Sequence, residues 1–64
     1  MREWLKNKRE EKHMTQMEIS KISGITQQYY SFIEAGERGT KLPVQTAKKI
    51  ANALEFDWRL FYEE

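Results

Sequence analysis

The hydrophobic and polar positions of the chain follow helical spacing in short segments, which glycine, proline and small polar residues separate. Arg2 to Lys12 holds eight charged residues in eleven, with strong helix formers throughout, and this predicts a first helix. Thr15-Gln16-Met17-Glu18 matches the S/T-x-x-E capping box, which predicts a second helix that runs to about Ser23. Gly24 then ends that helix.

The second half of the chain shows the same pattern. Thr26 is a candidate N-cap for a third helix, and Gly36 is placed to close it as a left-handed C′ residue. Residues 37–42 are predicted to form a loop, and Pro43 suits the first position of a fourth helix. One apolar stripe with spacings of three and four marks that fourth helix: Val44, Ala47, Ile50, Ala51 and Leu54.

Asp57 is placed to cap a last short helix that carries Trp58, Leu60 and Phe61. No segment alternates with period two for long enough to be a strand. The sequence therefore predicts five short helices that form one all-α domain over residues 1–64.

The connection between the second and third helices is very short. Only about three residues, 24–26, separate them, and a turn of this length forces a sharp crossing, as in a helix-turn-helix. An ordinary αα-hairpin within a small bundle is the alternative. Spacing alone leaves both open.

The two faces of the third helix favour the helix-turn-helix. Tyr30 and Ile33 continue the apolar line from Ile25 and are predicted to face the core. The side chains predicted to face outward are Gln27, Gln28, Ser31 and Phe32. Glutamine can form a bidentate pair with adenine, and an aromatic ring can pack on a thymine methyl. Exposed glutamines are often only solvated, but after so tight a turn we interpret these as base-reading groups.

Phosphate contacts are expected on both sides of this helix. The N-terminus of the second helix offers unpaired N–H groups that attract anions, and the amide of Gln16 could add to that contact. After the third helix, Arg38, Thr40 and Lys41 surround a flexible Gly39. A solvated basic loop is the commoner role for such residues, and their position is what favours a backbone contact.

One ion pair is predicted to be structural. Arg9 shares a helix face with Leu5 and is therefore aimed inward. Glu34 lies near the C-terminus of the third helix, where the helix dipole disfavours an anion. A bidentate, partly buried bridge between Arg9 and Glu34 would explain both positions.

Composition limits the remaining functions. The 64 residues are 39% hydrophobic and 33% charged, which fits a compact core that is too small for an enclosed active site. We therefore expect no enzyme, no catalytic residue and no cofactor. Without cysteine, and with His13 as the only histidine, neither disulfides nor a metal site is expected. No membrane span or signal peptide is present, so a cytoplasmic protein is predicted, and the net charge of +1 decides nothing about nucleic acid.

Three stretches resemble the phage-repressor and Cro-like (Xre-like) helix-turn-helix transcriptional regulators: "LKNKREEKHMTQMEIS", "SGITQQYYSFIEAGERG" and "TAKKIANALEFDWRLF". The resemblance implies a five-helix lambda-repressor-like domain with its motif at about residues 16–35 and a recognition helix at about 27–35. It implies phosphate contact at Gln16, base contacts at Gln27, Gln28 and Phe32, and backbone contact at Tyr29. The family also pairs the positions of Arg9 and Glu34, and His13 stands where members prefer Gly or Asn.

These implications define the expected function. The chain is expected to bind double-stranded DNA as a transcriptional repressor, as a dimer on an inverted repeat. Contacts between copies are expected near the last helix, at Trp58, Phe61 and Tyr62. The alternative role of these three side chains is to cap the core of the domain, and for Trp58 that alternative is favoured. The alternative is a protein-interaction module of the same fold, such as an antitoxin or an antirepressor-bound regulator. That module would offer Tyr29, Phe32 and the acidic tail of residues 63–64 to an antirepressor or a toxin.

Overall fold

All five helical segments predicted from the sequence are present in the computed structural model, which describes residues 1–36 and 42–63. Within these residues there is no strand. Four segments are α-helices and the last is a 3₁₀-helix, so the prediction of five short helices is corrected at the C-terminal end. The elements are α1 (Glu3–Glu11), α2 (Gln16–Ser23), α3 (Gln27–Ala35), α4 (Val44–Leu54) and the 3₁₀-helix η1 (Trp58–Tyr62).

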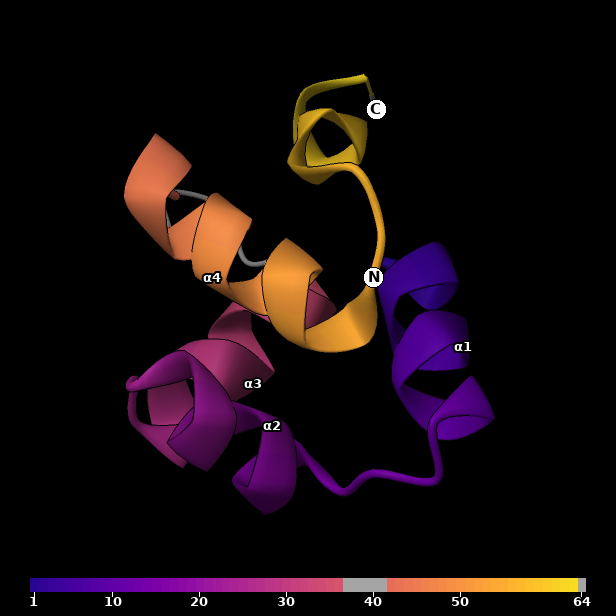
Figure 1. The fold of residues 1–64 in the computed structure, drawn as a ribbon, viewed down its shortest axis with the longest axis vertical. Coiled ribbons are helices and arrows are strands. Elements are labelled where there is room, and N and C mark those ends of the chain that lie inside the picture. The colour runs from indigo at the N-terminus through magenta and orange to yellow at the C-terminus, as the bar shows by residue number, and fades with distance from the viewer. Residues whose placement is uncertain (37–41, 64) are drawn as a thin grey trace.

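The helices pack around α4, which crosses the middle of the molecule (Figure 1). α2 packs against both α3 and α4, α1 packs against α3, and η1 packs against α4. In Figure 1 the α2–α3 pair lies below α4, η1 lies above it and α1 lies on the right. α3 is therefore supported by α1 on one side and by α2 on another.

One hydrophobic core joins all five elements. Its fully or nearly fully buried members are Leu5, Ile19, Tyr30, Ile33, Ala47, Ile50, Leu54 and Phe61. Trp4 and Phe56 extend it, with ring centroids 5.1 and 5.6 Å, respectively, from that of Phe61. Phe61 is only 3% exposed, so it packs in the core of one copy and leaves little surface for the expected contact with a second copy.

The predicted stripe of α4 is correct except at its first position. Ala47, Ile50, Ala51 and Leu54 are buried, whereas Val44 is 45% exposed. Pro43 is the N-cap of α4, not its first helical residue, and Val44 takes that first position. The buried stripe therefore begins one turn later, at Ala47.

The helix starts follow the local signals in the sequence. The capping box at α2 is complete: Glu18 N–H donates to Thr15 Oγ1 at 3.1 Å, and Thr15 N–H donates to Glu18 Oε1 at 2.8 Å. At η1 the side chain of Asp57 accepts a hydrogen bond from Arg59 N–H at 3.0 Å. These bonds satisfy amide groups that a helix N-terminus leaves unpaired.

Three helices end in the same way. A residue in the left-handed conformation follows the helix, and the N–H of the next residue donates to a carbonyl of the last turn. The left-handed residues are His13 (φ 56°) after α1, Gly24 (φ 72°) after α2 and Glu55 (φ 60°) after α4. In each case the next residue's N–H bonds back into the last turn, as Ile25 N–H does to Ser20 O at 3.0 Å. This is the Schellman arrangement, which favours glycine at the left-handed position.

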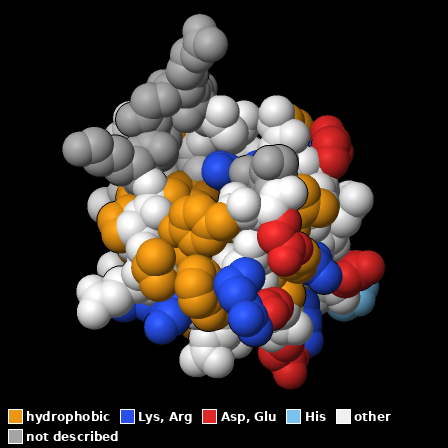
Figure 2. Space-filling model, turned by 90° about the horizontal axis from the view of Figure 1, so that it is seen from above, with side chains coloured by type: hydrophobic (Ala, Val, Ile, Leu, Met, Phe, Trp, Pro, Cys, Tyr) orange, Lys and Arg blue, Asp and Glu red, His pale blue; other side chains and the backbone are white. Residues whose placement is uncertain are grey.

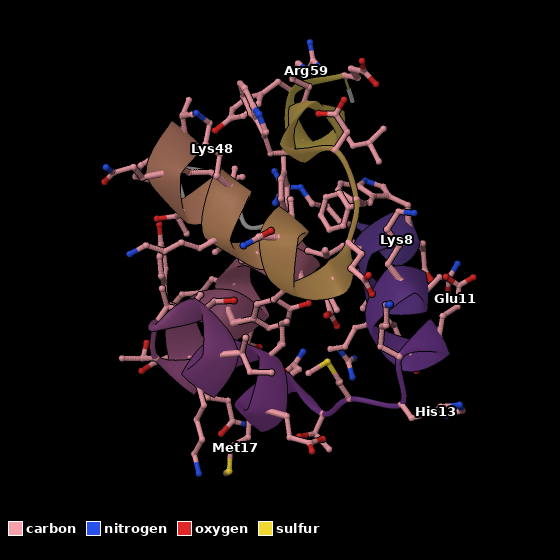
Figure 3. All side chains as sticks on the ribbon, viewed as in Figure 1. Lys8, Glu11, His13, Met17, Lys48 and Arg59 are labelled. Atoms are coloured by element: carbon pink, nitrogen blue, oxygen red, sulfur yellow. The ribbon has the colours of Figure 1, made fainter. Side chains whose placement is uncertain are left out.

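His13 lies at the bend between α1 and α2, and its side chain points away from the molecule (Figure 3). Its positive φ agrees with the resemblance, which places Gly or Asn there. Lys12, beside it, pairs with the carboxylate of Glu55 and so joins the ends of α1 and α4.

These left-handed positions give a first prediction. Gly24→Ala should lower the free energy of unfolding by about 1–2 kcal/mol, because a Cβ is strained at positive φ even where space is open. His13→Gly should raise it by about 0.5–1 kcal/mol, since the released strain exceeds the added entropy of the unfolded chain. Urea denaturation measures both. Equal effects of the two substitutions would contradict the assignment.

Candidate nucleic-acid interface

The connection from α2 to α3 is built from three residues, each with its own role. Gly24 takes the left-handed conformation that ends α2, and Ile25 N–H bonds back to Ser20 O. Thr26 is extended (φ −75°, ψ 154°), and its Oγ1 accepts from Tyr29 N–H at 3.1 Å. α3 therefore begins at Gln27, immediately after the turn, and packs against α2 as a helix-turn-helix requires.

α3 has a buried face and an exposed face, as predicted. Tyr30 and Ile33 are fully buried, whereas Gln27 and Gln28 are exposed in the first turn. Phe32 lies one turn beyond Gln28 and is 41% exposed. The outer face of α3 thus presents two neighbouring amides and one aromatic ring to solvent.

Two residues predicted to face outward or to contact the DNA backbone are less accessible. Ser31, predicted to face outward, is half-buried. Tyr29 is also half-buried and packs against the hydrophobic core, so its ring is shared between the core and the surface. A backbone contact from Tyr29 would therefore use the rim of the interface.

The C-terminal end of α3 is held by the predicted ion pair. Arg9 Nε lies 2.9 Å from Glu34 Oε2, and Arg9 Nη2 donates to Glu34 Oε1 at 3.0 Å. Arg9 Nη1 also donates to Met14 O at 2.8 Å, which ties the α1–α2 connection to the same group. Glu34 is 1% exposed. The bidentate, partly buried bridge expected from the sequence is therefore present.

Gln16 joins this group, which the sequence did not reveal. Its Nε2 donates to Glu34 Oε1 at 3.1 Å, and the side chain is half-buried. Glu18 and Thr15 already cap the same helix start. One of the two N–H groups of the Gln16 amide is thus used within the protein. Only the second N–H group of this amide remains for a phosphate contact.

Arg2 is a second contact that the sequence did not reveal. Its backbone N–H donates to Glu34 O at 2.8 Å, and its Nη1 donates to Ile33 O at 2.5 Å. A cation that binds the last carbonyls of a helix is favoured by the helix dipole. The guanidinium also lies 5.5 Å from the centroid of the Phe61 ring. No local signal predicts a contact between residues 31 positions apart.

The electrostatics of α3 follow from these bonds. Burial, the largest single influence, raises the pKa of the Glu34 carboxyl, but the hydrogen bonds that the carboxylate accepts, the strongest from Arg9, together with the charge of Arg9 outweigh it, so the pKa lies below its ordinary value. Burial raises the pKa of the nearby Tyr30 hydroxyl. Glu34 is therefore ionised and paired at neutral pH, and it is the only charged residue of α3.

Other predicted contact residues are placed as follows. Arg38, Thr40 and Lys41 lie outside the described residues. Trp58 is half-buried, with Lys48 Nζ 5.3 Å from its ring centroid. Tyr62 is 49% exposed, and its hydroxyl donates to Leu42 O at 2.6 Å. Seen from the η1 side, hydrophobic side chains gather on this face with Lys and Arg side chains among them (Figure 2).

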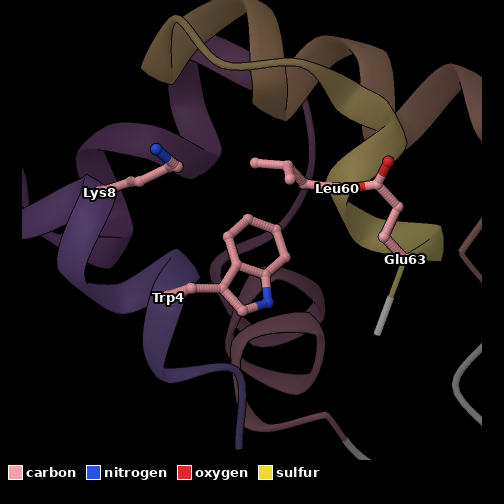
Figure 4. A pocket seen from close by; sticks show the side chains of 4 residues that line it. All are labelled: Trp4, Lys8, Leu60 and Glu63. Carbon is pink, nitrogen blue, oxygen red and sulfur yellow. The ribbon is translucent and has the colours of Figure 1, made fainter.

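No arrangement suited to metal binding or membrane insertion is present in the described part of the chain. No group of three His, Cys, Asp or Glu side chains there is placed to hold a metal ion. None of its helices combines the length and apolar character needed to cross a membrane. A shallow pocket between α1 and η1 is lined by Trp4, Lys8, Leu60 and Glu63, none of them a predicted DNA contact (Figure 4).

Comparison with known proteins agrees with this geometry. The profile of the helix-turn-helix family HTH_3 matches residues 5–61. The chain belongs to this helix-turn-helix family. A Bacillus subtilis (strain 168) protein named "Uncharacterized HTH-type transcriptional regulator YqaF" is 47% identical over 64 residues, which cover 100% of this chain and 82% of the relative. No solved structure matches the chain. The resemblance stated from the sequence is thereby confirmed, and both matches support a DNA-binding regulator.

The buried bridge gives a second prediction. Arg9→Met or Glu34→Gln should lower the free energy of unfolding by about 3–5 kcal/mol, because each leaves a buried partner unpaired. The side chains of this pair are 11% and 2% exposed, whereas those of Lys12 and Glu55 are 39% and 71% exposed. Lys12→Met is thus the matched control and should change stability little. Urea denaturation at pH 7 measures all three.

The same bridge predicts a pH dependence. The folded pKa of Glu34 is lowered, so the stability that its charge contributes is complete above the unfolded pKa of roughly 4.3. That contribution is lost as the pH falls through the folded pKa. The stability difference between wild type and Glu34→Gln should therefore narrow below about pH 4.3. A difference that stays constant down to pH 2 would contradict the assignment.

Proposed function

We propose that the protein is a sequence-specific transcriptional repressor that places α3 in the major groove of double-stranded DNA. The observation that carries the proposal is the pair of adjacent exposed amides, Gln27 and Gln28, in the first turn of a helix whose other face is fully buried. Residues at the N-terminal end of a recognition helix are the ones that reach base edges. The helix-turn-helix family match and the regulator relative support the same function.

Base selection would come from the outer face of α3. Each glutamine amide can donate to N7 and accept from N6 of adenine, and each such pair gives about 1–3 kcal/mol of discrimination. Phe32 would pack on a thymine methyl. Because Arg9, Gln16 and Arg2 hold the far end of α3, the amides project from a helix that is fixed at both ends.

Phosphate contacts would set the register of α3 in the groove. On one side, the second N–H of the Gln16 amide and the side chain of Tyr29, at the rim of the interface, would contact the phosphates of one DNA strand. Arg38, Thr40 and Lys41, which follow α3 in the sequence, are proposed for the backbone on the other side.

We propose that two copies act together on an inverted repeat. The described part of the chain extends 27 Å along its longest axis, whereas half-sites one helical turn apart are separated by about 34 Å. One copy therefore cannot read both half-sites, but two adjacent copies would nearly meet between them. Trp58 and Tyr62 remain the proposed contacts, since both keep exposed surface on the η1 face.

A protein-interaction role is the second candidate. The 41% exposure of Phe32 favours it, because an exposed aromatic on a polar face can also bind another protein, such as a toxin or an antirepressor. The half-buried position of Tyr29 weakens it. Salt separates the two roles: DNA binding weakens steeply as salt rises, whereas apolar protein contact does not.

Selection of bound sequences from random duplex DNA at low salt tests the main proposal. The wild type should enrich an inverted repeat, because two copies read equivalent half-sites. Gln28→Ala should relax the preference at one base pair of each half-site by about 1–3 kcal/mol. Sequencing of the enriched pools measures that preference.

Asn7→Ala is the matched control for Gln28→Ala. It removes an exposed amide from α1, outside the helix-turn-helix, and should leave the enriched sequence unchanged. Failure of the wild type to enrich any sequence at low salt would overturn the proposal.

The dimer proposal gives a separate prediction. Tyr62→Asp should weaken binding to a full inverted repeat by roughly tenfold or more, because a charge at an apolar contact between copies opposes association. Binding to an isolated half-site should stay the same. Gel-shift titration on the two duplexes measures this difference.

Tyr62→Phe keeps the ring and removes only the hydrogen bond to Leu42, so it serves as the control. It should retain the preference for the full repeat. If Tyr62→Asp weakens the half-site and the full repeat equally, Tyr62 does not lie between copies.

A further inference from the structure

The outer face of α3 carries no charged side chain. Its sequence is QQYYSFIEA, and its one charged residue, Glu34, is 1% exposed and bound to Arg9 and Gln16. The side chains that reach the surface are therefore two amides, one hydroxyl and aromatic rings. A helix that enters the major groove with this face offers only neutral groups to the bases.

Amide and aromatic side chains match a G·C pair less well than an A·T pair. Guanine presents two acceptors, O6 and N7, which Arg or Lys reads with two donors, and cytosine presents a donor that Glu or Asp accepts. α3 has none of these four side chains on its outer face. Adenine presents one donor beside one acceptor, which a single amide matches, and thymine presents a methyl group. The amides of Gln27 and Gln28 and the ring of Phe32 thus find their best partners in A·T pairs, whereas the hydroxyl of Ser31 can bond to either kind of pair.

From this match, and on the basis of the function proposed above, we infer that α3 selects a half-site core made of A·T pairs. Gln27 and Gln28 read two adenines, and Phe32 packs on the 5-methyl group of a thymine. Phe32 lies four residues beyond Gln28, a rise of about 6 Å along the helix, which is close to two base-pair steps of roughly 3.4 Å. The thymine therefore lies one or two pairs from the adenine that Gln28 reads.

The neutral face also separates specificity from salt dependence. The slope of log affinity against log salt reports phosphates neutralised by cations. Because Gln27, Gln28 and Phe32 carry no charge, their replacement changes base preference and leaves this slope unchanged. The slope comes from residues outside α3.

Single replacement of thymine by deoxyuracil tests the contact of Phe32, because it removes one methyl group and nothing else. In the site enriched by selection, each thymine is replaced in turn, and affinity is measured by titration at fixed salt. Replacing one particular thymine of each half-site should lower the affinity of the wild type about fourfold, which is the contribution of one buried methyl group. Phe32→Ala, and Phe32→Gln as a second variant, should bind thymine and deoxyuracil equally at that position.

Val44→Ala is the matched control for the Phe32 variants. Val44 is 45% exposed against 41% for Phe32, but it lies on α4. This variant should keep the fourfold loss at the same thymine. None of these side chains belongs to the core, so each variant is expected to fold. Thermal unfolding of each variant checks this.

The outcomes separate this inference from the proposed function. Enrichment of sites whose half-site cores contain G·C pairs, or a deoxyuracil effect that persists in both Phe32 variants, would overturn the inference and leave DNA binding intact. A changed salt slope in Gln28→Ala would also overturn it. Failure to enrich any sequence would instead overturn the proposed function, and the inference with it.

Discussion

The structure depends on one buried carboxylate, that of Glu34. An anion near the C-terminus of a helix is disfavoured by the dipole and by burial, so it persists only with strong partners. Arg9 supplies two charge-assisted hydrogen bonds from α1, and Gln16 supplies a third from the start of α2. Arg2 binds the adjacent carbonyls. Three helices are thus joined at the end of α3 that lies farthest from the exposed amides.

This constraint explains why the exposed face of α3 can be neutral and still well placed. Tyr30 and Ile33 fix the rotation of the helix about its own axis by their complete burial. Thr26 fixes its start, and the Glu34 group fixes its end. Gln27, Gln28 and Phe32 do not belong to the core, so their side chains can serve base recognition alone. A helix held less firmly would lose part of its binding energy to ordering on contact.

Much of the fold could be predicted from the sequence because its signals are local. The capping box at Thr15 and Glu18, the N-cap at Thr26 and the glycines at 24 and 36 act within one turn of the chain, and all act as expected. The inward face of α3 and the Arg9–Glu34 bridge could also be predicted, since helical spacing places a cation and an anion on buried faces. Prediction was less successful at the C-terminal end. There the last segment is a 3₁₀-helix, and the ring of Phe61 lies in the core beside that of Trp4.

By itself, the sequence determined where the helices begin and end, which face of α3 is apolar, and that the outward face lacks charge, because these properties depend on residues within a few positions of one another. Only the tertiary structure decided which distant groups share Glu34, that Arg2 closes the end of α3, and that Val44 is exposed while Phe61 is not. These outcomes depend on how separate helices pack, and the competing partners of a long polar or aromatic side chain become distinct only when the helices are placed in space.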